Sequence, residues 1–274
     1  MSTQPVWDIH VHEMQAARGV QRCMVPAGPL QGRPAELAFR FRPAAMVGGD
    51  FLDFFWLDKQ QLVFYLGDVA GKGLPAALYG ALVAGTLRGF HKSGVSPPAL
   101  LELLNQRLRI RVFPGHYCAV QYAVFDASSG EIRYASSGLP PPLHITATDC
   151  FQLDGAGLPT AMFDGSRYEV FTAQLSPGDA VLFATDGLTD AHNAKQEEFS
   201  MEQLVKVCAR HRKESAETLL GLIFEALDTF VAGPAARRHH RRHTEDRLNR
   251  RPAILGAMPR DEVRANPVCA AGAG

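Results

Sequence analysis

Three aspartates that stand beside glycines constrain this chain more than any other feature. They occur in Gly48-Gly49-Asp50, in the run from Gly67-Asp68-Val69 to Gly71-Lys72-Gly73, and in Thr185-Asp186-Gly187, each next to an apolar run. An aspartate at the end of a buried strand places its carboxylate at the rim of the core, and glycines let the backbone approach a ligand closely. Three converging carboxylates repel one another unless a hard cation lies between them. Oxygen-only ligands favour Mg²⁺ or Mn²⁺ over Zn²⁺, so the pattern predicts such a site.

The surrounding segments predict an α+β domain. Strand-like apolar runs alternate with helical periodicity, and the stretch Asp126–Gly130 reads as a hairpin turn between two strands. Hairpins followed by helices favour layered sheets over a βαβ array. The expected helices are 7–24, 75–91, 97–111, 200–212 and 215–230, and the expected strands are 36–42, 61–67, 118–125, 131–136, 168–173 and 180–184.

Charge and cysteine usage exclude several classes of protein. Nine arginines and four acidic residues follow position 230, so residues 1–230 carry 19 basic and 24 acidic residues, which argues against nucleic-acid binding. Five scattered cysteines form no C-x-x-C pair, as is typical of reduced thiols. No signal peptide is visible, and no apolar window approaches the ~18 residues of a membrane span. We expect a cytoplasmic protein that does not contact the membrane.

The motifs resemble those of one family in order and spacing. The run from Phe41 to Asp53 resembles R-P-A-x-x-V-G-G-D-x-x-D, Gly67–Ala77 resembles G-D-V-S-G-K-G-x-P-A-A, and Leu175–Asp190 resembles L-x-P-G-D…T-D-G-[LV]-T-E. The segment Gln21–Pro26 resembles the Q-x-x-L-x-P lead-in. These motifs are similar to those of the SpoIIE/RsbU-like, PPM-type (type 2C-like) metal-dependent serine/threonine protein phosphatases. One departure is Ser137–Pro140, which lacks the histidine of the usual A-G-H-x-P.

The resemblance implies a fold and a mechanism. The fold is an antiparallel β-sandwich flanked by helices, with two Mn²⁺ or Mg²⁺ ions held by Asp50, Asp68, Asp186 and the Val69 carbonyl. A water that bridges the two ions attacks phosphorus, so no side chain acts as the nucleophile. The substrate is phosphoserine or phosphothreonine on a regulatory protein, such as an anti-sigma-factor antagonist.

The roles of two cations stay open between two possibilities. Arg42 and Lys72 either contact the phosphate or brace the loops around the site. Gly71-Lys72-Gly73 lacks the spacing of a nucleotide-binding P-loop, so we do not expect a nucleotide there.

The end of the chain departs from the family. The family's last strand, D-D-[IM]-T-x-x-V, supplies a further metal ligand, but Arg237–His243 reads Arg-Arg-His-His-Arg-Arg-His. One codon choice for that run, read one base later, encodes Asp-Asp-Ile-Thr-Val-Val. Rival interpretations are an ordinary disordered basic tail, a histidine-rich metal site and a nucleic-acid patch. The acidic pair Glu245-Asp246 is a candidate replacement, but we expect no apolar strand after it.

We therefore divide the chain into a helical lead-in and linker (1–34), a phosphatase domain (35–236) and a frame-shifted, disordered tail (237–274). The last strand of the sandwich is expected to be missing. An alternative function follows, a pseudophosphatase that binds a phosphoprotein without turnover because the final ligand is absent. The apolar Trp7/Val11/Met14 face of helix 7–24 predicts a homodimer through that helix, because soluble monomers rarely leave such a stripe exposed.

Overall fold

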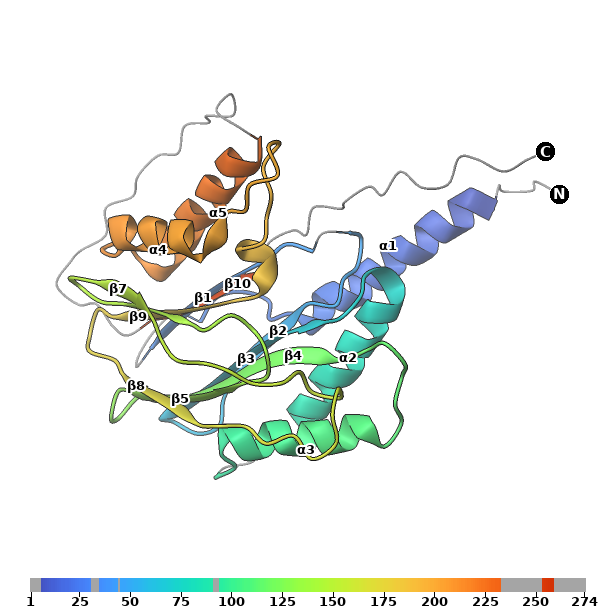
Figure 1. The fold of residues 1–274 in the computed structure, drawn as a ribbon, viewed down its shortest axis with the longest axis horizontal. Coiled ribbons are helices and arrows are strands. Elements are labelled where there is room, and N and C mark those ends of the chain that lie inside the picture. Colours follow the sequence, from blue (N-terminus) through green and yellow to red (C-terminus); the bar gives the residue numbers. More distant parts are fainter. Residues whose placement is uncertain (1–5, 31–34, 44, 91–93, 233–252, 259–274) are drawn as a thin grey trace.

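Two five-stranded sheets pack face to face, with helices on both outer faces (Figure 1). The computed structural model describes residues 10–30, 35–43, 45–90 and 94–232, together with the backbone of 6–9 and 253–258. Six helices lie within these residues: α1 (Val6–Met24), α2 (Gly73–Phe90), α3 (Pro97–Arg109), the short η1 (Asp186–Leu188), α4 (Ser200–His211) and α5 (Ala216–Ala232). Among the described helices, none combines the length and the apolarity that crossing a membrane requires.

The first sheet, sheet B, is antiparallel throughout. Its order is β2-β3-β4-β5-β8, formed by β2 (Phe51–Trp56), β3 (Gln61–Val69), β4 (Cys118–Asp126), β5 (Glu131–Ser136) and β8 (Phe171–Gln174). The interior strand β3 is buried from Leu62 to Gly67, as its continuous apolar run predicts. Helices α2 and α3 cover its outer face, where Leu100 and Leu104 of α3 are fully buried.

The second sheet, sheet A, is mixed. Its order is β1-β10-β9-β6-β7, formed by β1 (Glu36–Phe41), β10 (Ala253–Met258), β9 (Ala180–Ala184), β6 (Leu143–Ile145) and β7 (Cys150–Gln152). Strands β1, β10 and β9 run parallel, whereas β6 pairs antiparallel with β9 and β7. Helices α4 and α5 cover the outer face, and Leu219, Leu220 and Ile223 of α5 fill the core there.

A third hydrophobic core lies between the two sheets, in addition to the one beneath α2 and α3 and the one beneath α4 and α5. Phe64 of β3 and Phe183 of β9 meet with ring centroids 5.4 Å apart, and Tyr134 of β5 packs edge-on against Phe183. The predicted helix-flanked sandwich is therefore confirmed. The parallel trio in sheet A is a feature that the prediction did not include.

The predicted absence of the last strand is wrong for this structure. Ala253–Met258 forms β10 between β1 and β9 and pairs with both. The physical reason is that two parallel strands with unpaired backbone groups need a strand between them, and a six-residue apolar run is long enough to supply it. This run also contradicts the expectation that no apolar strand follows Asp246. The basic run Arg237–His243 and the pair Glu245-Asp246 lie outside the described residues.

Candidate metal centre at one edge of the sandwich

The ends of β3 and β9 lie at the same edge of the sandwich. In sheet A the register pairs Arg40 with Ala257 and Ala257 with Ala184, so β1 and β9 end level with each other. From the end of β1 the chain crosses to β2, which starts beside the end of β3 because Phe51 pairs with Gly67 (Figure 1). This edge therefore receives the residues that follow β9, the residues that precede β2, and the last residues of β3.

Asp50 and Asp68 come together at this edge. The β2–β3 ladder pairs Phe51 with Gly67, and one further step along it places Asp50 opposite Asp68. The preceding residue is packed against the end of β3, because a Cβ built on Gly49 would lie only 2.7 Å from the Val69 carbonyl oxygen. Any side chain at position 49 would therefore push the two segments apart, so glycine is what lets these backbones approach.

A buried thiol reports the same convergence. Cys118, the first residue of β4, pairs with Val69 and is fully buried. Burial raises the pKa of its thiol, and the charges of Asp68 and then Asp50 raise it further. Both carboxylates thus lie close enough to one sulfur atom to act on it. A carbonyl oxygen, that of Val69, lies beside them.

Asp186 stands at the end of β9 in a tight turn. Its carbonyl oxygen accepts hydrogen bonds from the backbone N–H groups of Thr189 (2.9 Å) and Asp190 (2.8 Å) and from the Thr189 hydroxyl (3.0 Å). The turn holds the backbone while the residue itself stays exposed. Within the part of the chain that the structure describes, however, no three His, Cys, Asp or Glu side chains form a group that could hold a metal ion. The role of Asp186 as a third ligand stays a prediction.

The donor set fits a hard divalent cation. Carboxylate and carbonyl oxygens are the ligands that Mg²⁺ and Mn²⁺ prefer, whereas the neighbouring thiol of Cys118 is fully buried. The two carboxylates and the Val69 carbonyl oxygen would supply three oxygen donors from adjacent strands.

The side chains of Arg42 and Lys72 take different positions. Arg42 donates to both carboxylate oxygens of Asp228 on α5, at 2.5 and 3.1 Å, and its guanidinium lies 4.7 Å from the centre of the Phe224 ring. It therefore braces the end of β1 against α5. Lys72 is exposed in the loop between β3 and α2 and makes no side-chain hydrogen bond or ion pair to the described residues. A contact between Lys72 and a phosphate stays a prediction.

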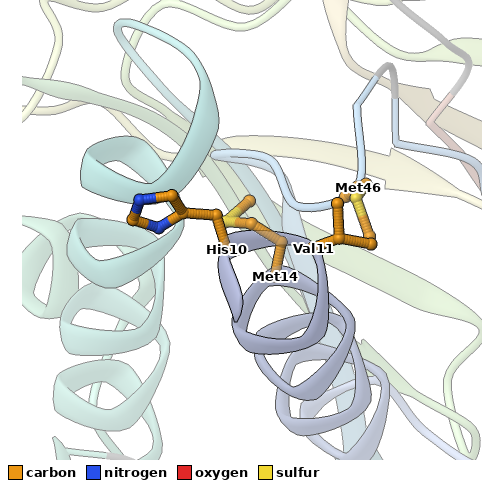
Figure 2. A pocket seen from close by; sticks show the side chains of 4 residues that line it. All are labelled: His10, Val11, Met14 and Met46. Carbon is orange, nitrogen blue, oxygen red and sulfur yellow. The ribbon is translucent and has the colours of Figure 1, made fainter. Parts of the chain in front are cut away.

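Helix α1 is tied to the loop that carries Asp50. The Gln21 side-chain amide donates to the Gly48 carbonyl oxygen (2.6 Å), and its oxygen accepts from the Gly48 N–H (3.2 Å). These two hydrogen bonds hold Gly48, which comes two residues before Asp50 in the chain. Nearer the N-terminus of the helix, His10, Val11 and Met14 line an apolar groove of about 190 Å³ together with Met46. Figure 2 shows these four side chains around the groove.

Sequence reasoning assigned no role to a third carboxylate, Asp53. It is buried in β2 and pairs with Arg88 of α2, and it also accepts a hydrogen bond from the Tyr65 hydroxyl (3.2 Å). The Arg88 guanidinium lies 4.9 Å from the Phe55 ring centre. The sequence signal for Asp53 is its position as the last aspartate of the V-G-G-D-x-x-D motif. Its partners show that it fastens α2 to sheet B rather than facing the metal centre.

Comparison with known proteins assigns the chain. The sequence model of the family described as Stage II sporulation protein E (SpoIIE) matches residues 58–246, which is more than half of the chain. The chain belongs to the SpoIIE family. A member with a stated activity, "Phosphoserine phosphatase RsbU" of Bacillus subtilis, is 25% identical over 219 residues, covering 78% of this chain and 64% of RsbU. "Protein IcfG" of Synechocystis is 23% identical, over 76% of this chain and 37% of IcfG. The chain thus spans less than two thirds of either relative.

Several solved structures share the fold. The SiaA-PP2C domain of Pseudomonas aeruginosa superposes with a TM-score of 0.72 at 16% identity, over 85% of this chain and 94% of that domain. The RsbU and RsbW domains of Rv1364c from Mycobacterium tuberculosis superpose with a TM-score of 0.61 at 28% identity, over 70% of this chain and 54% of that one. RsbX, which has a TM-score of 0.50 at 15% identity, was crystallised in complex with magnesium.

Proposed function

We propose that this chain hydrolyses phosphoserine or phosphothreonine on a regulatory protein, with Asp50, Asp68, Asp186 and the Val69 carbonyl holding two Mn²⁺ or Mg²⁺ ions. The observation that carries the proposal is the approach of Asp50 and Asp68 to each other at the end of β3, in a chain of the SpoIIE family. The names of the relatives support the chemistry, because RsbU is a phosphoserine phosphatase. An anti-sigma-factor antagonist is the substrate class that we favour.

Each residue of the site contributes a separate function. When bound at Asp50, Asp68, Asp186 and the Val69 carbonyl, the ions would supply an activated water as the nucleophile and would neutralise charge on the phosphoryl oxygens. Asp50 and Asp68 provide the negative charge that binds the ions, and Gly49 keeps the two strands close enough for them to share a site. Lys72 extends into solvent, where its ammonium can donate to a phosphate oxygen. Cys118 is fully buried, so its thiol is not accessible to a phosphorylated substrate and does not act as the nucleophile.

A direct assay tests this function. The full chain should hydrolyse p-nitrophenyl phosphate when Mn²⁺ or Mg²⁺ is added, and a chelator should abolish the turnover. A serine-phosphorylated peptide should release inorganic phosphate under the same conditions. Turnover that persists after the metal is removed would contradict the proposed mechanism.

One observation favours a second candidate, a pseudophosphatase that binds a phosphoprotein without turnover. Asp50 and Asp68 are brought together, but within the described residues no group of three ligating side chains forms. With less negative charge, the site would bind divalent ions more weakly. Phosphopeptide binding without metal-dependent turnover of p-nitrophenyl phosphate would decide for this alternative.

Location and self-association are part of the same proposal. We place the protein in the cytoplasm, in keeping with the free thiols of the four described cysteines. We also propose that two copies pair through α1, because Val11 and Met14 line an apolar groove on this helix. Sedimentation of the full chain measures this association, and Met14→Gln should weaken it.

A further inference from the structure

Six large apolar side chains lie exposed beside the candidate metal centre. We call them the apolar rim, and their exposed fractions range from 37% to 66%. The rim consists of Ile110, Val112, Phe113 and Tyr117, from the loop between α3 and β4, and Leu158 and Phe163, from the loop before β8. Exposed apolar side chains that gather in one region mark an interaction site more often than isolated ones do.

Backbone hydrogen bonds fix the first rim loop at the metal-centre edge. The N–H of Ala70 donates to the Tyr117 carbonyl oxygen (2.9 Å), and the next residue, Cys118, pairs with Val69. The Phe113 ring meets the His116 ring at 4.4 Å between centroids. The loop therefore lies alongside the segment that runs from Asp68 to Lys72.

The second rim loop is joined to the first. Thr160 and Cys118 exchange backbone hydrogen bonds of 2.8 and 3.0 Å, so Thr160 lies beside the first residue of β4. Leu158 comes two residues before Thr160 in the chain. Asn105 of α3 accepts from the Ala161 N–H (2.8 Å) and donates to the Phe163 carbonyl oxygen (3.0 Å). Both loops are thus held on α3 and β4, so the rim is a built surface rather than two separate loop tips.

The charges around the rim favour an anionic partner. Arg109 donates two hydrogen bonds, of 2.6 and 2.8 Å, to the Asp164 carboxylate and so offsets its charge. The Glu102 carboxylate is likewise paired with Arg167. The exposed cations Lys72 and Arg111 flank the same loops. A partner that brings apolar side chains together with a phosphate would match both features.

We propose that the apolar rim binds the segment of the substrate protein around its phosphoserine, and that this segment carries apolar side chains. This rests on the proposed function, because the rim borders the site where the phosphate would be hydrolysed. The rim then selects among phosphoproteins, whereas the metal centre accepts any phosphate ester that reaches it.

Two phosphopeptides of equal length test the proposal. One carries Leu, Val and Phe around its phosphoserine, and the other carries Ser, Asn and Gly at those positions. Fluorescence anisotropy with the full chain, without added metal, should show about tenfold tighter binding of the apolar peptide. Val112→Ser and Phe113→Ser should each remove most of this difference, while turnover of p-nitrophenyl phosphate with Mn²⁺ stays unchanged.

Phe151→Ser is the matched control. Phe151 is also an exposed phenylalanine, but it lies on β7, opposite His144 and level with Val181 at the start of β9. This substitution should leave the preference between the two peptides intact. Thermal unfolding of all three variants should match that of the parent chain.

The outcomes separate this inference from the proposed function. Equal affinity for the two peptides, or equal losses in the rim and control variants, would overturn the role of the rim. So would a change in sedimentation of Phe113→Ser with unchanged peptide binding, because the rim would then join two copies of the chain. Peptide discrimination without any metal-dependent turnover would instead refute the phosphatase function and leave the rim in place.

Discussion

Strand β10 should decide whether the domain folds, and removing it is the sharpest test of the structure. A chain that ends at residue 236 lacks Ala253–Met258, which pairs with six residues of β1 and five of β9. About ten ladder hydrogen bonds disappear, at ~0.5–1.5 kcal/mol each. The total, on the order of 5–15 kcal/mol, equals the whole stability expected of a domain. We therefore expect the shortened chain to be largely unfolded at 37 °C.

Circular dichroism and amide hydrogen exchange measure this effect. The parent chain should unfold cooperatively, and the amides of β1 and β9 should be protected, whereas the shortened chain should lose both properties. A chain that ends at residue 258 is the matched control and should behave like the parent. If the chain ending at 236 kept the parent's melting temperature and its protection in β1 and β9, the pairing of β10 would be refuted.

Three further predictions concern the site, α1 and the end of the chain. Asp68→Asn and Asp186→Asn should each abolish Mn²⁺-dependent turnover of p-nitrophenyl phosphate without lowering the melting temperature, because an amide keeps the size but loses the charge; near-normal turnover in either would remove that residue from the ligand set. Deleting residues 1–22 removes both hydrogen bonds between the Gln21 side chain and Gly48 and should lower activity and stability; an unchanged, strictly monomeric protein would contradict this. A chain with Asp-Asp-Ile-Thr-Val-Val at 237–242 and the corrected frame after it loses Ala253–Met258, and we expect its new apolar run to take the place of β10 between β1 and β9 while its aspartates add charge to the candidate metal centre. That chain should be more soluble and more active than the parent; equal solubility and turnover would show that the tail is native.

Local patterns were enough to predict most elements. The helix predicted for 7–24 is α1, and the apolar runs predicted for 118–125 and 180–184 are β4 and β9. The strand predicted for 168–173 instead spans Phe171–Gln174, since only these residues pair with β5. The period of apolar residues gives the type of an element, but its ends depend on the partner strand.

Long-range pairings could not be predicted in the same way. Arg42 meets Asp228 186 residues later in the chain, and Asp53 meets Arg88 only because α2 packs on sheet B. No local rule links such residues, so Arg42 was left open between phosphate and bracing roles. The sequence does not predict strand β10 because its short apolar run stands alone after a basic, polar stretch. Six residues are nevertheless enough for a strand.

The spacing between Asp50 and Asp68 depends on more than the β2–β3 ladder. Gly48 is held by Gln21 of α1, and a Cβ on Gly80 of α2 would lie 2.8 Å from the Gly49 carbonyl oxygen. The loop that carries Asp50 is thus enclosed by α1, α2 and β3. Because α2 is itself fastened to β2 by the Asp53 ion pair, the packing of α2 on sheet B fixes how closely the two carboxylates approach. The approach of these two carboxylates is therefore a product of helix packing as much as of strand pairing.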